Sequence, residues 1–83
     1  MNKEKVLSII ECIFQDILDN KGLKINVSDT PEDVENWDSV NNVNIIIALE
    51  SEFNIKLSMD QITNIKSVGD LLNFVCESKV NSN

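Results

Sequence analysis

The sequence of 83 residues predicts an all-α fold: a four-helix bundle with three longer helices, one short third helix and a long loop between helices 1 and 2. Apolar residues recur at the three- and four-residue spacing of helices that bury one face. Three residues that commonly cap helices, Asp38, Ser58 and Ser67, each stand just before such a segment. No segment alternates convincingly between apolar and polar residues, so no half-buried strand is expected.

The first helix is predicted from about Lys3 to Asp19. Its buried face is expected to form around a stripe of aliphatic side chains flanked by further apolar residues: Val6, Ile10, Ile13 and Ile17, with Leu7, Phe14 and Leu18. Lys21-Gly22 is expected to end the helix, because glycine readily takes the left-handed conformation that follows a helix.

Residues 20–37 are predicted to form a long loop, because they contain Gly22, Pro31 and a run of acidic residues. Such a long connection is unusual unless it serves a purpose. Trp37 at its end either marks a site for partners or, as lone tryptophans more often do, anchors the loop to the bundle. Four apolar side chains of the loop are expected to pack against the bundle: Leu23, Ile25, Val27 and Val34.

The second helix is predicted from Ser39 to Phe53. Asp38 is its expected N-cap, because its carboxylate can accept a hydrogen bond from a first-turn N–H group. Ser39 is then the first helical residue, with its hydroxyl exposed. Three consecutive isoleucines could suggest a strand, but the periodicity of the whole segment and the cap favour a helix. The broad apolar arc of this helix is expected to comprise Val40, Val43, Ile46, Ile47, Leu49 and Phe53.

A short third helix is predicted to begin at a capping box, in which Ser58 is the cap and Gln61 reaches back, and to end near Asn64. The last helix is predicted to begin after the cap Ser67, with Asp70 near its positive end. We expect a single domain over residues 1–83, with an ordered core over about 3–78 and a frayed polar tail over 79–83. The buried stripe of the last helix is expected to comprise Val68, Leu71, Leu72 and Val75.

Acidic residues surround the start of the second helix. Between residues 29 and 60 eight acids stand against Lys56 alone, and this segment accounts for the whole net charge of −7. Such a surface repels nucleic acid and anionic membranes, and it attracts basic partner proteins. The alternative is a solvated loop whose charge only keeps the protein soluble.

Residue content excludes several classes of function. The chain has no histidine, so no Ser-His-Asp relay can form, and no Gly-x-Ser-x-Gly motif surrounds Ser39. Cys12 and Cys76 form neither a metal motif nor a disulfide framework, and residues 29–38 lack the central glycine of a calcium loop. Neither a membrane-spanning segment nor a secretory signal is visible, so we expect a cytoplasmic protein. Ser39 is therefore interpreted as a substrate and not as a catalyst.

Three segments resemble motifs of a known family: Trp37-Asp38-Ser39-Val40, Ala48-Leu49-Glu50-Ser51-Glu52-Phe53 and Ser67-Val68-Gly69-Asp70-Leu71-Leu72. Together they resemble the acyl carrier protein family over essentially the whole chain. The resemblance implies that Ser39 carries 4′-phosphopantetheine, attached covalently from coenzyme A, and that Asp38 caps the helix and takes part in partner recognition. It also implies that the arm holds an acyl or aminoacyl group as a thioester and that the protein is not an enzyme.

The same resemblance implies a phosphopantetheinyl transferase as a partner. It further implies acyl-transfer, ketosynthase or ligase-type enzymes of fatty acid, polyketide or related biosynthesis, with basic docking surfaces. We expect a monomer that binds no nucleic acid, membrane or metal. The best-known fatty acid carriers have acids where Asn41 and Asn44 stand, so a dedicated carrier of a secondary pathway is an equally open alternative. The residues expected to contact partners are Val40, Ile47, Glu50 and Asp60.

Other interpretations remain open at this point. The chain could be an unmodified helical interaction module that binds a basic partner through its acidic loop and second helix. Glu50 falls toward the apolar arc, so its partner is expected within the protein, either Lys66 or a loop N–H group. Four side chains could part to shelter an acyl chain or simply pack in the core: Val43, Ile47, Ile62 and Ile65.

Overall fold

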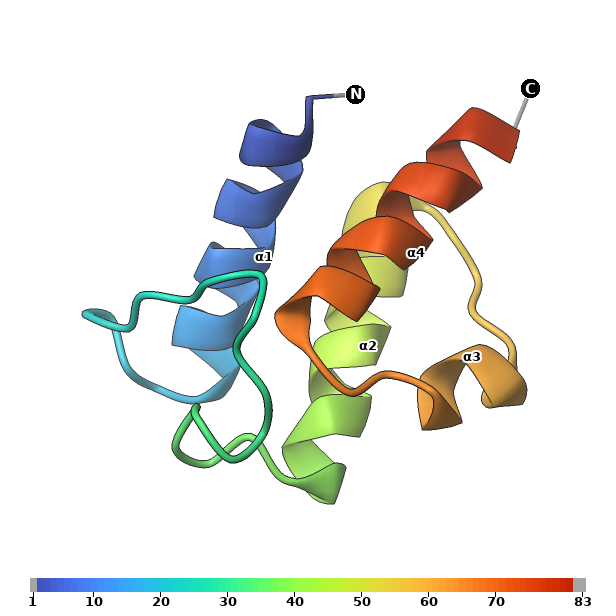
Figure 1. Ribbon diagram of the computed structural model, residues 1–83. Helices are drawn as coiled ribbons and strands as arrows, with labels where there is room; N and C mark the ends of the chain where they lie inside the picture. Colours follow the sequence, from blue (N-terminus) through green and yellow to red (C-terminus); the bar gives the residue numbers. More distant parts are fainter. Residues whose placement is uncertain (1, 82–83) are drawn as a thin grey trace.

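Four helices and one long loop make up residues 2–81, the part of the chain that the computed structural model describes, with side chains through residue 78. Figure 1 shows α1, α2 and α4 as the long helices and α3 as a short one. Helix α1 packs against both α2 and α4. The predicted all-α bundle, with a short third helix and a long first loop, is confirmed. The helices are α1 (Lys3–Ile17), α2 (Ser39–Phe53), α3 (Met59–Thr63) and α4 (Val68–Asn81).

Helix α1 begins at the cap Asn2, whose Oδ1 atom accepts a hydrogen bond of 2.7 Å from Glu4 N. It ends at Ile17, before the predicted end at Asp19, because Asp19 takes the left-handed conformation with a φ of 53°. Gly22 does not have a positive φ, so the prediction that Lys21-Gly22 ends the helix is wrong.

The buried face of α1 is centred on one four-residue row: Val6, Ile10, Phe14 and the following Leu18. The predicted stripe includes Ile13 and Ile17, which are only partly buried at the edge of the core. Phe14 lies at the centre because the Trp37 ring packs edge-on against it, with the ring centroids 4.9 Å apart. The loop thus contributes Trp37 to the packing around Phe14.

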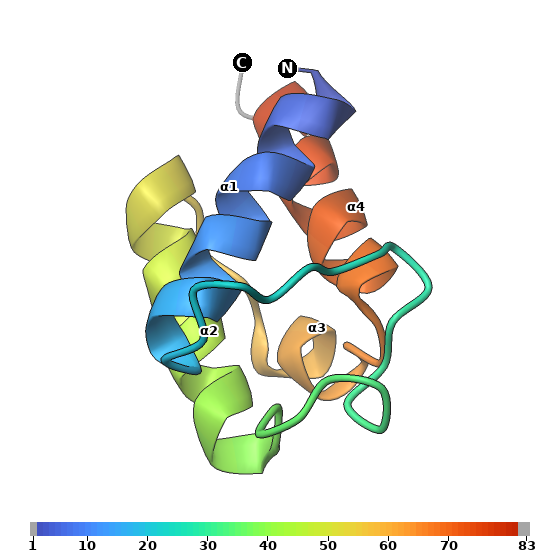
Figure 2. The same ribbon diagram turned by 90° about the vertical axis from the view of Figure 1, so that its left-hand side faces the viewer.

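Residues 18–38 connect α1 to α2 by a detour across the bundle. Figure 2 shows the loop running from the end of α1 toward the start of α4 and back to α2. Ile25 and Val34 are buried, as predicted, and Leu23 is partly buried. Val27 is 48% exposed, so its predicted burial is wrong. The Val27 backbone faces the bundle instead, since Val27 O accepts a hydrogen bond of 2.8 Å from Gly69 N of α4.

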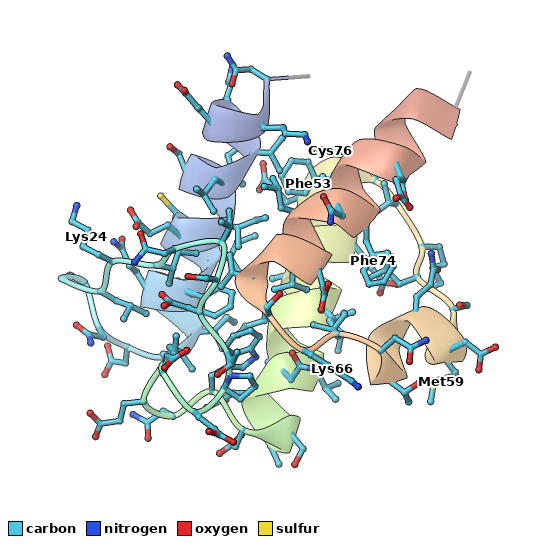
Figure 3. All side chains as sticks on the ribbon, in the orientation of Figure 1. Lys24, Phe53, Met59, Lys66, Phe74 and Cys76 are labelled. Atoms are coloured by element: carbon cyan, nitrogen blue, oxygen red, sulfur yellow. The ribbon has the colours of Figure 1, made fainter. Side chains whose placement is uncertain are left out.

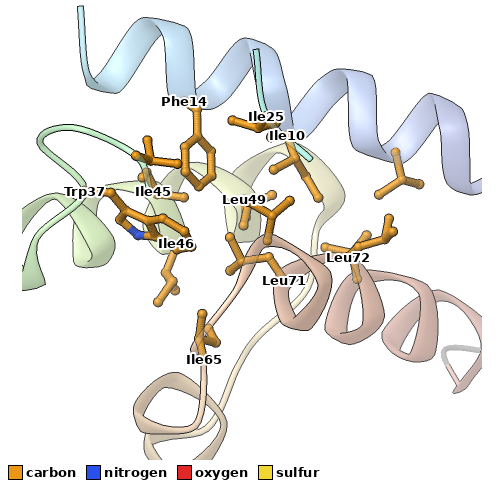
Figure 4. Close-up of a cluster of buried hydrophobic side chains, with 14 of the residues drawn as sticks. Ile10, Phe14, Ile25, Trp37, Ile45, Ile46, Leu49, Ile65, Leu71 and Leu72 are labelled. Atoms are coloured by element: carbon orange, nitrogen blue, oxygen red, sulfur yellow. The ribbon is translucent and has the colours of Figure 1, made fainter. Parts of the chain in front are cut away.

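Helix α2 has the predicted bounds and the predicted N-cap. Figure 4 shows side chains of its buried side directed into the core. The broad apolar arc predicted for α2 does not coincide with its buried side, because its members Val40, Val43 and Ile47 are 70%, 50% and 58% exposed. Apolar residues lie on nearly every side of α2, so their spacing does not select the side that packs. The buried residues are Ile45, Ile46, Leu49 and Phe53.

Helices α3 and α4 begin as predicted. Gln61 N donates to Ser58 Oγ at 3.1 Å and Ser58 N donates to Gln61 Oε1 at 2.8 Å, which completes the capping box of α3. Asp70 N donates a hydrogen bond of 3.3 Å to Ser67 Oγ at the start of α4. The helix continues through Asn81, past the predicted start of the tail at residue 79, and residues 82–83 lie outside the described part. The predicted stripe of α4 is buried in full: Val68, Leu71, Leu72 and Val75.

One hydrophobic cluster joins the long helices and the loop (Figure 4). Leu57 and Ile65 bring the segments on both sides of α3 into this cluster, while α3 itself has no buried residue. Within the described residues, no helix is long and apolar enough to span a membrane.

Candidate functional site

The start of α2 is built on the Asp38 cap. Asp38 is in an extended conformation with a φ of −110°, and its Oδ1 atom accepts a hydrogen bond of 2.8 Å from Asn41 N. The Asp38 carbonyl oxygen accepts a hydrogen bond from Asn42 N at 2.8 Å. Ser39 is therefore the first residue of the helix, and its side chain is exposed to solvent, as predicted.

Trp37 holds the chain in place directly before this cap. Its side chain is 2% exposed, and its ring meets that of Phe14 of α1 at an angle of 78°. The Trp37 Nε1–H group donates a hydrogen bond of 2.9 Å to Asn42 Oδ1, in the first turn of α2. The interpretation of Trp37 as an anchor of the loop is confirmed. Ser39 follows a tryptophan that is fastened to both α1 and α2.

Asn36 turns the chain into the helix. Its backbone is left-handed, with a φ of 71°, a conformation that asparagine adopts more readily than most residues. Its carbonyl oxygen accepts hydrogen bonds from Asp38 N at 3.0 Å and from Asn41 Nδ2 at 2.9 Å. No role is predicted for Asn36 or Asn42 from the sequence, although an asparagine shortly before a helix cap, such as Asn36, is a typical sign of a tight turn.

This arrangement suits a hydroxyl that another protein modifies. The chain has no histidine, so no imidazole base can activate Ser39 Oγ from within. The first N–H groups of an α-helix have no partner inside the helix and carry a partial positive charge, which stabilises an attached phosphate. The Asp38 carboxylate takes up only the N–H group of Asn41. An exposed hydroxyl at this position therefore fits the phosphodiester link that the expected cofactor requires.

The other predicted site residues lie along α2 and at the start of α3. Val40 and Ile47 are exposed on α2, and Asp60 is exposed in the first turn of α3. Glu50 is half-buried, and its Oε2 atom accepts a hydrogen bond of 2.9 Å from Leu57 N. Of the two internal partners expected for Glu50, the loop N–H group is the correct one. This carboxylate ties α2 to the segment before α3.

Several acids near the site hold the backbone of loops and helix ends. Asn26 N donates to Asp29 Oδ2 at 2.8 Å, and Thr30 N donates to Asp33 Oδ2 at 3.0 Å. Acids expected to attract partners therefore also have a structural role, which their three-residue spacing from Asn or Thr could have indicated. Carboxylates that accept a backbone hydrogen bond are those of Glu11, Asp29, Asp33, Asp38, Glu50 and Asp70.

The side chains that could shelter an acyl chain are divided between the core and the surface. Ile65 is buried and Ile62 is partly buried against the core, so the core-packing interpretation holds for both. It is wrong for Val43 and Ile47, which face solvent.

The fold and the site define a class of protein: a small helical bundle with an exposed serine at the start of a long helix. Comparison with known proteins gives the family. Residues 8–75 match the family model described as phosphopantetheine attachment site. The chain belongs to this family, and within it to the acyl carrier proteins.

Individual acyl carrier proteins are similar to this chain over most of their length. One from Rickettsia bellii is 34% identical over 79 residues, which cover 90% of this chain and 91% of that protein. One from Thermosynechococcus vestitus is 29% identical over 75 residues, which cover 90% and 93%. The solution structure of holo acyl carrier protein from Geobacter metallireducens has a TM-score of 0.83 at 26% identity, covering 92% of this chain and 87% of that one. The crystal structure of acyl carrier protein from Thermotoga maritima has a TM-score of 0.88 at 18% identity, covering 100% and 96%, and has the same fold.

Membership of the family establishes what the protein does. It is an acyl carrier with a phosphopantetheine prosthetic group, and it is a carrier and not a catalyst. The expected function and cofactor are thereby confirmed. Members of the family interact with a phosphopantetheinyl transferase and with biosynthetic enzymes. The alternative of an unmodified interaction module is not favoured.

Proposed function

We propose that Ser39 is the residue that carries 4′-phosphopantetheine and that Asp38 positions it. The observation that supports this proposal is the exposed Ser39 hydroxyl at the first position of α2, between the Trp37 anchor and the cap hydrogen bond. Ser39 Oγ forms a bond to the coenzyme A phosphorus that carries the pantetheine arm, the pyrophosphate bond of coenzyme A breaks, and 3′,5′-adenosine bisphosphate leaves. The proposed source of the base that removes the hydroxyl proton is the transferase, since the chain has no histidine and the neighbouring Asp38 carboxylate accepts a hydrogen bond from Asn41 N. When attached, the group supplies a thiol that holds an acyl or aminoacyl group as a thioester.

The chain itself positions this group and is recognised by enzymes. A tether at a fixed point raises the effective concentration of the carried group at each enzyme that binds the protein. We propose that enzymes bind beside Ser39 on Val40 and Ile47, with Glu50 and Asp60 at the edge of this surface. The proposed partners are acyl-transfer, ketosynthase or ligase-type enzymes of fatty acid, polyketide or related biosynthesis. We also propose that the carrier works as a monomer in the cytoplasm.

Intact-protein mass spectrometry tests the attachment residue. Co-expression with a broad-specificity phosphopantetheinyl transferase is expected to add one phosphopantetheine group to the wild-type protein and none to Ser39→Ala. Ser51→Ala removes an exposed serine near the other end of α2, and this matched control is expected to be modified like the wild type. Modification of Ser39→Ala would contradict the proposal. So would an unmodified wild-type protein under conditions that modify a control carrier.

A further inference from the structure

Two side-chain amides in the first turn of α2 form hydrogen bonds that span Ser39. Asn41 Nδ2 donates to Asn36 O at 2.9 Å. Asn42 Oδ1 accepts from Trp37 Nε1 at 2.9 Å. Both asparagines are half-buried, and each bond joins residues five positions apart, one more than a backbone hydrogen bond inside an α-helix. Because each bond joins a residue before Ser39 to one after it, the two bonds hold the Ser39 backbone from both sides.

The bond between Trp37 and Asn42 is the harder of the two to replace. The indole is 2% exposed, and Figure 4 shows it beside Phe14 in the core. An indole has one hydrogen-bond donor, and a buried donor without an acceptor costs more free energy than the bond contributes. The carbonyl group of Asn36, by contrast, is at an exposed position, where water can replace the Asn41 amide. Asn42 Oδ1 is therefore the atom that ties the indole to α2.

Ser39 needs such support because it is the first residue of α2. Its N–H group is one of those that a helix leaves without an internal partner, and helix ends fray more readily than helix centres. An oxygen that attacks phosphorus must lie close to that atom and in line with the leaving group. A misplacement of about 1 Å can lower the rate on the order of a hundredfold. The rate of modification at Ser39 therefore depends on how firmly the first turn is held.

We propose that Asn42 is a positioning residue for the modification of Ser39. Its Oδ1 atom holds the buried indole of Trp37, and the indole fixes the segment that leads into the first turn of α2. Asn42 acts through Trp37 and not through contact with coenzyme A or the transferase. Its loss therefore lowers the rate of transfer and leaves the affinity for the transferase nearly unchanged. The proposal rests on Ser39 as the attachment residue.

The kinetics of a purified broad-specificity phosphopantetheinyl transferase at saturating coenzyme A test this role. Asn42→Ala is expected to lower kcat about threefold to tenfold, because the bound complex holds the Ser39 hydroxyl in line with the phosphorus for a smaller fraction of the time. The KM for the carrier is expected to change by less than about twofold. Asn42→Asp keeps an oxygen that can accept the indole N–H and is expected to retain kcat within about twofold.

A double-mutant cycle separates positioning from direct contact with the transferase. Trp37→Phe removes the donor of the same hydrogen bond but keeps an aromatic ring beside Phe14, and it is expected to lower kcat by about the same factor as Asn42→Ala. Adding Asn42→Ala to Trp37→Phe is expected to lower kcat by less than about twofold more, because the bond is already absent. If Asn42→Ala does not fold, Trp37→Phe alone tests the bond through its kcat and KM.

Phe53→Leu is the control for loss of stability. Figure 3 shows Phe53 at the far end of α2 from Ser39, and its side chain is 3% exposed. The smaller side chain is expected to lower the free energy of unfolding by about 1 kcal/mol and to leave kcat at the wild-type value. Circular dichroism at the assay temperature and Tm show that each variant is folded and how far its stability is lowered.

Three results would overturn the proposal. The first is a kcat of Asn42→Ala, or of Trp37→Phe, that equals the wild-type value. The second is a double variant in which the two losses multiply, since Asn42 would then contact the transferase itself. The third is an equal loss of kcat in Phe53→Leu, which would show that stability alone limits the rate. Failure of attachment at Ser39 is distinguished from all three, because the wild-type protein would gain no mass.

Discussion

At the scale of single residues, the site depends on side chains that satisfy backbone N–H groups. Asp38 accepts a hydrogen bond from Asn41 N, and Glu50 accepts one from Leu57 N near the other end of α2. An N–H group left without an acceptor at a partly buried position costs more than the bond contributes, because it has also lost its water. The position of Ser39 therefore depends on its neighbour Asp38 as well as on its own place in the chain.

Asp38→Ala is expected to lower the free energy of unfolding by about 1 kcal/mol, the usual contribution of an N-cap, and Tm by roughly 4–8 °C. Asp38→Asn is the matched control, since asparagine is an equally good cap, and it is expected to retain most of the stability. Urea denaturation followed by circular dichroism measures both variants. Equal losses in the two would mean that the charge of Asp38, and not its hydrogen bond, stabilises α2.

At the scale of elements, α4 is joined to the loop by two backbone hydrogen bonds. Val68 N donates to Asp29 O at 2.9 Å, and Gly69 N donates to Val27 O at 2.8 Å. The first N–H groups of α4, which have no partner inside the helix, are thus satisfied by the loop. Gly69 permits this close approach, because a Cβ atom there would lie 3.0 Å from Val27 O.

Gly69→Ala is expected to destabilise the protein by about 1 kcal/mol, because the new methyl group pushes the Val27 carbonyl away from α4 and outweighs the helix propensity of alanine. Gly22→Ala is the matched control: its Cβ atom would meet only Asn20 Oδ1, at 3.9 Å, and its φ is not positive. The control is expected to leave stability unchanged or raise it by up to about 1 kcal/mol. Thermal unfolding measures both. A Gly69→Ala variant more stable than the wild type would show that the loop moves away from the new methyl group at little cost in free energy.

The bounds of the helices are largely predictable from local signals. The cap Asp38 fixes the start of α2, and the pair Ser58 and Gln61 fixes the start of α3. The end of α1 is an exception, because Asp19 takes the left-handed conformation for which glycine is the usual sign. The buried side of α2 is a different kind of property. It is set by where α1 and the other packed segments lie, so the spacing of Val43 and Ile47 does not show that they face solvent.

At the scale of the whole molecule, burial of a small core stabilises the folded state and the large net charge destabilises it. A domain of 83 residues has a free energy of unfolding of only about 4–12 kcal/mol. Fourteen acids against seven bases reduce it further through self-repulsion. Part of this cost is offset by the acids that hold the backbone, such as Asp29 and Asp33. The net charge of a segment therefore indicates repulsion among its acidic residues. It does not show which of the carboxylates are free to contact a partner.

Salt is expected to stabilise the protein. Raising NaCl from about 0.02 to 0.3 M is expected to raise Tm by roughly 2–5 °C, because screening reduces the repulsion among the acids between residues 29 and 60. Glu32→Gln combined with Glu35→Gln is expected to raise Tm at low salt and to weaken this dependence. Glu77→Gln, at an exposed acid of α4 outside that segment, is the control. It is expected to raise Tm at low salt less and to weaken the salt dependence of Tm less. A Tm that decreases with added salt, measured by calorimetry, would show that attractive ion pairs dominate.

The candidate site is predictable from sequence in one respect and not in another. The Asp38-Ser39 pair is a local pattern, so the position of the hydroxyl at a helix start follows from it directly. The apolar surface beside it could not be predicted, because packing of the core determines which side of α2 is buried and which is exposed. Asn36 and Asn42 are missed for a related reason, because their hydrogen bonds exist only once the loop has been folded back onto α2.

Trp37 is the only tryptophan of the chain, which also has no tyrosine. Its indole is buried against Phe14, is hydrogen-bonded to Asn42, and stands two residues before Ser39. The tryptophan fluorescence of the protein therefore arises from one residue, at the junction that supports the hydroxyl. Trp37 is therefore an intrinsic fluorescence probe that needs no attached dye. An enzyme that loosened this junction on binding would expose the indole to water and shift its emission to longer wavelength.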